Sequence, residues 1–141
     1  MTSAVRVASD KNKERKAVTK KKIESLLKRA EKVPEVLKKG WTQGPVAVDK
    51  WDSSVDPLSK KAVKWCFLGA LYKAAGKEED NFRMEYLYDR AFDEINEEGS
   101  WIIRFNEDPG RTQKQVVKMA ERCLKLIRRK GEKWLDENSF A

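Results

Sequence analysis

Five residues in two separated turns carry side chains that could bind a phosphate-bearing or nucleotide-like ligand. They are Trp41 and Gln43 in the first turn, and Asn106, Arg111 and Thr112 in the second. If the turns meet, they offer an aromatic face, two amides, a guanidinium and a helix N-terminus, which together suit an anion. The alternative is structural: Thr112 would cap its helix, Asn106 would stabilise its turn, and Arg111 would brace a neighbouring carboxylate or carbonyl.

A second group of candidate residues is basic and lies near the two ends of the chain. The group comprises Lys13, Arg15, Lys16, Lys20, Lys21, Lys22, Arg128, Arg129 and Lys130. Phosphate contacts need only positive donors, so these residues could hold RNA or DNA without reading its sequence. The alternative is a solubilising tail. No zinc finger, glycine-rich phosphate loop or aromatic RNA-binding signature accompanies the basic residues.

The charge of the chain is unevenly distributed. Residues 1–40 carry the whole net charge of +8, and residues 41–141 are neutral. We define the acidic ridge as Glu85, Asp89, Asp93 and Glu97. We define the basic ridge as Lys114, Lys118, Arg122, Lys125 and Arg129. The ridges could join two copies or bind another protein, because complementary patches steer association. The alternative, which we favour, is that the two helices lie side by side and neutralise each other within one molecule.

The residue types present exclude several kinds of chemistry. The chain has no histidine and two cysteines, which excludes Ser-His-Asp and Cys-His mechanisms, histidine metal ligands and a zinc cluster. The carboxylates that could share a cleft are Asp52, Asp56, Asp93 and Asp108. Nothing in the sequence fixes their separation, so we predict no enzyme activity, no metal and no cofactor. Cys66 and Cys123 are expected to be reduced thiols in the core.

The element that must position these residues is an apolar stretch in the middle of the chain. Between residues 62 and 75 the charged residues are two lysines, a pattern typical of a helix that is buried on several faces. Asp56 and Pro57 suit the start of a helix and Gly76 suits its left-handed end. The sequence therefore predicts a central core helix over residues 57–75. Gly69 in its middle indicates that another backbone approaches closely there.

Further helices are predicted around the core helix. Apolar spacing indicates a helix that begins at Thr19, a short helix over 34–39 and a longer one over 82–97. Residues 101–105 suit a helical turn capped by Ser100, or a short strand. Residues 112–115 form a capping box, which opens a strong helix that Gly131 ends or kinks.

The domain organisation follows from these elements. Residues 1–18 lack a usable periodicity and are predicted to be a basic flexible arm. Residues 19–141 are predicted to form a single compact all-α domain of four to five helices around the buried central helix.

Three local patterns occur in an order that is similar to that of a known group of proteins. They are Trp-Thr-Gln-Gly at 41–44, Trp-Cys-Phe-Leu-Gly-Ala at 65–70 and Asn-Glu-Asp-Pro-Gly-Arg-Thr at 106–112. Together they resemble a small family of uncharacterised bacterial and phage proteins, over about residues 20–128. Members of that family usually have Asn-Asp before the Pro-Gly-Arg-Thr turn, whereas Glu107 intervenes here. The resemblance implies a compact helical domain in a bacterial or phage setting, and it implies no chemistry.

These observations predict a non-catalytic binding protein. We expect an accessory bacterial or phage factor that engages an anionic partner, with RNA or DNA as the preferred one, through the basic arm and the basic helix. The alternatives are a pocket protein that sequesters a nucleotide-like ligand, and a protein–protein inhibitor or assembly subunit. There is no apolar run near the ~20 residues that span a bilayer and no secretory signal, so we expect a cytoplasmic protein without membrane contact.

Overall fold

The structure is a computed structural model that describes residues 3–96 and 101–135, with side chains from residue 13 onward. Its α-helices are α1 (Ser3–Ala30), α2 (Val33–Lys39), α3 (Phe67–Ala75), α4 (Asn81–Ile95), α5 (Ile102–Glu107) and α6 (Gln113–Trp134). A 3-10 turn, η1 (Glu78–Asp80), precedes α4. Two short antiparallel strands, β1 (Ala47–Val48) and β2 (Lys64–Trp65), pair Ala47 with Trp65. The predicted all-α class is confirmed.

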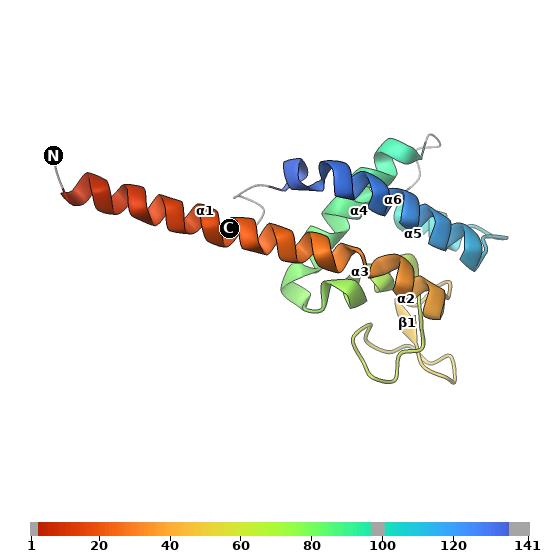
Figure 1. Ribbon diagram of the computed structural model, residues 1–141. Helices are drawn as coiled ribbons and strands as arrows, with labels where there is room; N and C mark the ends of the chain where they lie inside the picture. Colours follow the sequence, from red (N-terminus) through yellow and green to blue (C-terminus); the bar gives the residue numbers. More distant parts are fainter. Residues whose placement is uncertain (1–2, 97–100, 136–141) are drawn as a thin grey trace.

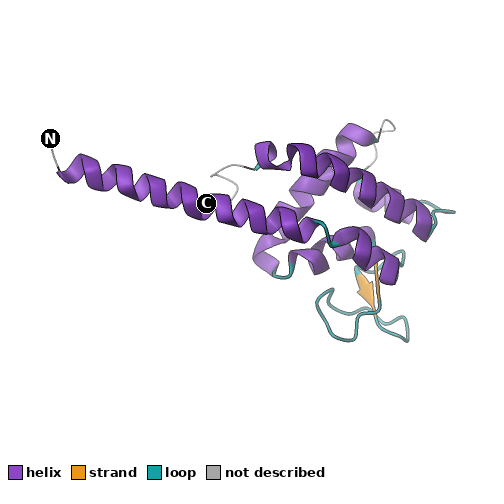
Figure 2. Ribbon diagram, viewed as in Figure 1, coloured by secondary structure: helices purple, strands orange, loops and turns teal. Residues whose placement is uncertain are grey.

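The helices pack around one core, from which α1 projects (Figure 1). Helix α4 packs on α6, α2 packs on α3 and α6, and the C-terminal part of α1 packs on α6 and α3. The small sheet and its long loops lie at one edge of the helical body (Figure 2). Cys66 and Cys123 are free and buried, as expected, and burial raises the pKa of both thiols.

The predicted core helix is buried but half as long as expected. Helix α3 spans Phe67–Ala75, and it begins after Cys66, whose Sγ accepts a hydrogen bond from the backbone N–H of Gly69 at 3.3 Å. The predicted start at Asp56 is wrong, because Asp56 accepts the N–H of Leu58 in a local turn instead. Residues 57–66 form turns and β2, and the Trp65 indole N–H donates to the carbonyl of Pro57 at 2.9 Å. Pairing with β1 therefore outweighs the local helical pattern. The predicted left-handed end at Gly76 is confirmed, with φ of 79°.

The close approach expected at Gly69 is confirmed. A Cβ atom at this position would lie 1.7 Å from the carbonyl oxygen of Val46, the residue before β1. Only glycine fits here, and this contact locks the strand pair onto the face of α3.

Helix α1 is longer than predicted. It runs without interruption from Ser3, so the predicted helix start at Thr19 is wrong. Residues 3–22 contain no glycine or proline and are rich in alanine, lysine and arginine, which favour helix. The packed half, with Ile23, Leu26 and Ala30 buried, supplies the nucleus from which the helix can propagate towards the N-terminus.

The remaining helical predictions agree with the structure. Helix α4 matches the predicted segment from residue 82 to Ile95, and residue 97 lies outside the described residues. The helical interpretation of residues 101–105 is confirmed by α5, and the capping box of α6 is present on both sides. Ser100, the proposed cap of α5, lies outside the described residues. Gly131 does not end α6, which continues to Trp134. Leu27 of α1 packs close to Gly131, where a side chain would otherwise be.

Candidate nucleic-acid interface

The N-terminal basic residues lie on α1, which extends beyond the helical body. Six of them are exposed: Lys13, Arg15, Lys16, Lys20, Lys21 and Lys22. In the part of the chain that the structure describes, none of the six forms an ion pair. Their charges are therefore uncompensated by close partners and available to an external anion.

Buried polar contacts fix the base of α1 on the body. The hydroxyl of the fully buried Tyr88 donates to the carbonyl of Ala30 at 2.7 Å, which satisfies the end of the helix. The guanidinium of Arg29 donates to the carbonyl of Ala75 and, at 2.8 Å, to Asp80 Oδ2. These contacts hold the projecting half of α1 in a set direction relative to α3 and η1.

A cleft of about 500 Å³ separates α1 from η1 and the first turn of α4. Lys21, Lys22 and Ser25 line its α1 side, and Arg83 lines the other. Asp80 lies at its base and binds Arg29 and Arg83, the latter at 3.0 Å. Burial raises the pKa of Asp80, but the hydrogen bond and charge of Arg29 outweigh this and lower that pKa below its usual value. Asp80 therefore stays ionised and orders the arginines, while Lys21 and Lys22 remain at the rim.

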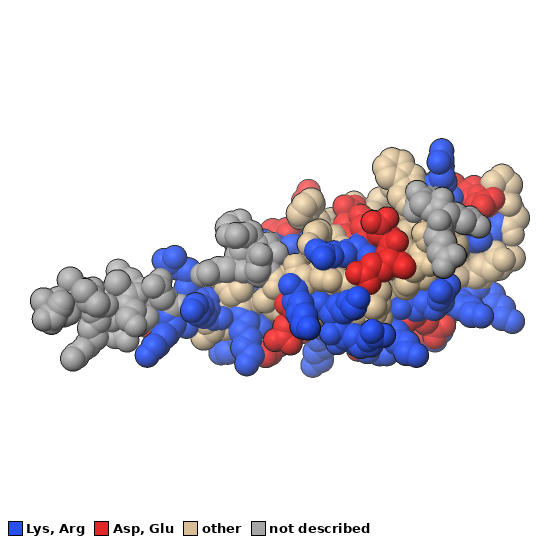
Figure 3. Space-filling view, turned by 90° about the horizontal axis from the view of Figure 1, so that it is seen from above, with Lys and Arg blue, Asp and Glu red and all other residues tan. Residues whose placement is uncertain are grey.

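The C-terminal cluster lies beside α1, so the two predicted groups share one side of the molecule. Arg128 makes a bidentate hydrogen bond to Glu31, just after α1, with a 2.8 Å contact from Nε to Oε1. Lys130 pairs with Glu94 of α4 at 3.1 Å, whereas Arg129 is exposed. A shallow groove of about 260 Å³ between α1 and the end of α6 is lined by Lys16 and Lys20, with Glu132 opposite. Figure 3 shows Lys and Arg gathered along this edge. We call the exposed basic side chains of these two groups the basic face; they are Lys13, Arg15, Lys16, Lys20, Lys21 and Lys22 of α1 and Arg128 and Arg129 of α6.

The structure brings three of the five predicted ligand-binding residues, Trp41, Gln43 and Asn106, together at the N-terminus of α3, where hydrogen bonds join them; Arg111 and Thr112 lie in the turn before α6 and bond to other residues. Asn106 is 1% exposed, and its Oδ1 accepts from the Trp41 indole at 2.7 Å and from the N–H of Phe67 at 3.0 Å. Gln43 Nε2 donates to the carbonyls of Asn106 and Asp108, both at 3.0 Å. These amides are occupied by contacts that join the two turns to the core.

The other two members also have structural partners. Arg111 Nε donates to the carbonyl of Phe105 at 2.8 Å, and its guanidinium lies 3.8 Å from the centroid of that ring. A further hydrogen bond joins Arg111 to Asp108 at 3.1 Å. Thr112 accepts from the N–H of Gln115 at the helix cap. The structural interpretation of these residues accounts for the contacts observed, and the binding of a nucleotide-like ligand here stays a prediction.

Sequence reasoning misses two members of these networks. Glu107 accepts the N–H of Gly44 with both carboxylate oxygens, at 2.6 and 2.9 Å, and so closes the first turn onto the second. Asp80 lies in an acidic stretch of the sequence, yet three cations surround it in the structure. Part of this cluster could be predicted, because Lys77 and Arg83 lie three residues before and after Asp80, a spacing that allows ion pairs on a helix. The third cation, Arg29 of α1, is remote in sequence.

The four suspected catalytic carboxylates are divided among three parts of the fold. Asp52 and Asp56 belong to the loop between the strands, Asp93 to α4 and Asp108 to the turn before α6. In residues 3–96 and 101–135 no group of three or more Asp, Glu, Cys or His side chains could hold a metal ion.

The two charged ridges do not pair with each other along their length. Helices α4 and α6 lie side by side, as expected, but the ion pair that joins them uses Lys130 and Glu94, each adjacent to a ridge residue. Glu97 of the acidic ridge lies outside the described residues. Within the described part, Glu85, Asp89 and Asp93 make no ion pair. The described acidic ridge is therefore not neutralised within the molecule.

The fold and the site together define a small all-α protein with a basic helical extension. A model described as a family of unknown function (DUF6197) matches residues 18–126, and the chain belongs to this family. The N-terminal half of α1 and the 128–130 cluster lie outside the matched segment. No match was found among curated proteins or solved structures. None of the described helices is long and apolar enough to cross a bilayer.

Proposed function

We propose that this protein is a non-catalytic binding protein that holds RNA or DNA through its basic face. The observation that carries the proposal is the projecting part of α1, where six exposed cations have no ion-pair partner among the described residues. Retaining so many uncompensated charges on one helix favours a partner with regularly spaced negative charges. Nucleic-acid backbones provide such charges, and flexible lysines can contact them without base recognition.

The two flanks of α1 suit a strand that runs along the helix. Lys21 and Lys22 face the cleft beside η1, and Lys16 and Lys20 face the groove beside α6. A strand on the α6 flank would meet Lys16 and Lys20 from successive turns, about 5.4 Å apart along the helix, and a strand on the cleft flank would meet Lys21 and Lys22 within one turn. Release of condensed counterions, rather than shape or base edges, then supplies the affinity, so binding is independent of sequence and sensitive to salt.

Replacing Lys20, Lys21 and Lys22 together with glutamine tests the proposal. If each lysine contacts one phosphate, affinity for a labelled single-stranded oligonucleotide falls on the order of 100-fold at about 0.1 M salt. Fluorescence anisotropy measures this change. The side chains are exposed, so circular dichroism should report an unchanged fold.

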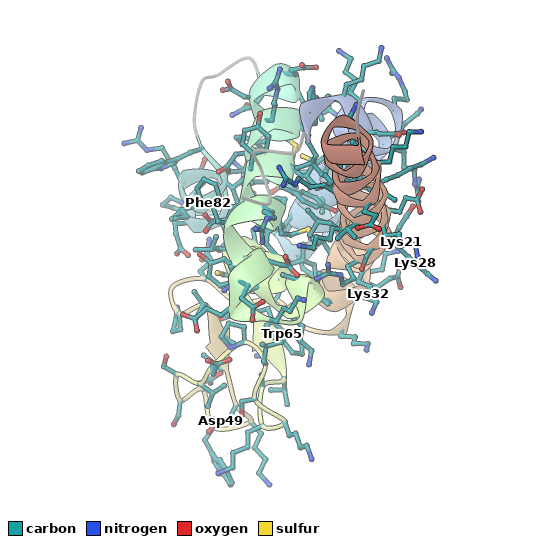
Figure 4. All side chains as sticks on the ribbon, turned by 90° about the vertical axis from the view of Figure 1, so that its left-hand side faces the viewer. Lys21, Lys28, Lys32, Asp49, Trp65 and Phe82 are labelled. Carbon is teal, nitrogen blue, oxygen red and sulfur yellow. The ribbon has the colours of Figure 1, made fainter. Side chains whose placement is uncertain are left out.

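The matched control removes three lysines from the opposite end of the molecule. Lys50, Lys60 and Lys61 are exposed and lie between β1 and β2. Asp49, at the start of this segment, lies well away from Lys21 (Figure 4). Replacing the three lysines with glutamine changes net charge equally and should leave affinity within about threefold, since long-range charge is screened. An equal fall in affinity in the two triple variants would contradict a specific role for α1.

A bacterial or phage setting and a cytoplasmic location form part of the proposal. The ordered patterns at 41–44, 65–70 and 106–112 support the setting through their resemblance to bacterial and phage proteins. Two free, buried cysteines suit a compartment in which thiols stay reduced. In this role the protein needs no cofactor and no metal.

A further inference from the structure

An apolar groove of about 620 Å³ lies between α4 and α5. Three large apolar side chains on its rim are exposed: Phe82 by 75%, Trp101 by 67% and Ile103 by 48%. Tyr86 and the half-buried Leu68 contribute to its lining. Exposed aromatic side chains gathered around one groove are typical of a protein-binding surface rather than of ordinary surface composition.

One wall of this groove is negatively charged. Glu85, Asp89 and Asp93 line it from α4, at intervals of about 6 Å along the helix. Arg90 also lines the groove, but it forms no ion pair with these carboxylates in the described residues: its Nη1 donates to the Tyr86 hydroxyl at 2.8 Å and its guanidinium lies 5.3 Å from the centroid of the Trp134 ring. Glu85 accepts a hydrogen bond from the Tyr72 hydroxyl, and none of the three carboxylates forms an ion pair in the described residues. The groove therefore combines aromatic rings with carboxylates that have no cationic partner, which suits lysine or arginine side chains with apolar stems.

We propose that the α4–α5 groove of one copy of this protein binds the projecting segment 13–22 of α1 from a second copy. Charge complementarity selects this occupant, because segment 13–22 presents six cations and one acid to three groove carboxylates. The segment also offers the half-exposed Val18 and six long basic side chains whose aliphatic stems can pack on Phe82 and Trp101.

The occupant comes from a second copy because α1 cannot reach its own groove. Ile23, Leu26 and Ala30 anchor α1 on the body, and its N-terminal half points away from it (Figure 1). Lys21 and Phe82 lie on opposite sides of the molecule (Figure 4). A contact between two different surfaces is head-to-tail, and it forms open chains unless its rotation closes a ring.

Self-association of this kind does not depend on nucleic-acid binding, but the two interactions compete for the same part of α1. Both use the cations of α1, whereas the groove belongs to self-association alone. Variants of the groove therefore distinguish the failure of one proposal from the failure of the other, since they leave the basic face intact.

Sedimentation velocity of the full chain without nucleic acid tests the proposal. At low salt we expect weight-average mass to rise with concentration beyond that of a dimer, and to return to the monomer at high salt. Two variants should each remain monomeric when alone. The groove variant, Asp89→Lys/Asp93→Lys, reverses the charge of the groove. The helix variant, Lys20→Glu/Lys21→Glu/Lys22→Glu, reverses the charge of the projecting helix.

Mixing the two variants is the decisive experiment. Each variant keeps one intact surface, and the two reversed surfaces are again opposite in charge, so an equimolar mixture should associate although neither variant does so alone. A mixture that remains monomeric would overturn the proposal, as would a wild-type chain that is monomeric at every concentration. Continued self-association of the helix variant would assign the groove to another occupant and would equally overturn it.

The exposed aromatic residues provide a second variant that does not alter charge. Phe82→Ser/Trp101→Ser should fold normally, because both side chains are mostly exposed, and should weaken self-association at least about tenfold. The same variant should bind the oligonucleotide as the wild type does. Unchanged self-association would show that the groove is not used.

Acidic pH should weaken the contact. Partial burial, together with the charges of Glu85 and Asp93, raises the pKa of Asp89 to about 6. Tyr72 of α3 and Cys123 of α6 also face Asp89, and both stay neutral because their pKa values are raised. Asp89 is thus largely charged at about pH 7.5 and protonated at about pH 5, so association should be weaker at the lower pH. The variant Asp89→Asn should lose most of this pH dependence, and an undiminished dependence in that variant would count against a role for Asp89.

Discussion

Replacing Asn106 with alanine is expected to lower the free energy of unfolding by about 3–4 kcal/mol. The Asn106 side chain is buried and makes four hydrogen bonds: Oδ1 accepts from Trp41 and Phe67, and Nδ2 donates to Thr42 and Glu107. Alanine would leave the N–H of Phe67 buried without an acceptor, at a cost of about 1–3 kcal/mol, and would open a cavity beside Trp41. Urea denaturation followed by circular dichroism measures the change.

Gln43→Ala is the matched control for Asn106. Gln43 joins the same two turns, but it is exposed and its two acceptors can bond water once the side chain is removed. We expect the free energy of unfolding to fall by about 1 kcal/mol or less. If Asn106→Ala costs no more than Gln43→Ala, Asn106 is not what holds the turns to α3, and a ligand-binding role for this cluster would deserve a direct search.

The second large effect is expected at Gly69. Alanine here would place Cβ 1.7 Å from the Val46 carbonyl oxygen and 2.7 Å from its carbon, both backbone atoms that cannot rotate away. The strand pair must shift, and we expect a net destabilisation of about 3 kcal/mol even after the higher helix propensity of alanine is counted. Such a change is a large share of the stability of a small domain and should appear as a lower urea midpoint.

Gly131→Ala provides the comparison, because Gly131 also lies inside a helix. There the nearest obstacle is the end of the Leu27 side chain at 2.7 Å, which can adopt another rotamer. Alanine should therefore be within about 1 kcal/mol of wild type. Equal losses of unfolding free energy for Gly69→Ala and Gly131→Ala would contradict the claim that the close contact of α3 with the backbone before β1 requires glycine at position 69.

The parts of the fold that depend on local pattern could be predicted from the sequence. The capping box at Thr112 and Gln115, the left-handed Gly76 and the amphipathic stripe of α6 are all set by neighbouring residues. The contact between the turns around Trp41 and Asn106 was a condition of the proposed ligand site rather than a prediction, and it is present in the structure. The close approach of another backbone at Gly69 could also be predicted, because glycine inside a helix lowers helix stability relative to alanine and so indicates a packing requirement.

The parts that depend on remote contacts could not be predicted. Cys66 is a rare helix cap, and residues 57–66 leave the helical pattern because β1, some 18 residues earlier, pairs with Lys64 and Trp65. Helix α1 extends to Ser3 because its packed half supplies the nucleus, which the polar N-terminal pattern does not reveal. The grouping of Arg29 with Asp80, and the apolar groove beside α5, both require the tertiary arrangement.

The dependence of oligonucleotide affinity on salt concentration tests the central claim most directly. Phosphate binding by α1 predicts a straight, steeply negative plot of log affinity against log salt for the wild type and for Lys50→Gln/Lys60→Gln/Lys61→Gln. The slope for Lys20→Gln/Lys21→Gln/Lys22→Gln should be shallower by about 2, because each lysine that neutralises a single-strand phosphate adds roughly 0.7 to the slope. Identical slopes for all three proteins, or affinity that does not change with salt, would contradict the claim that the basic face holds nucleic acid.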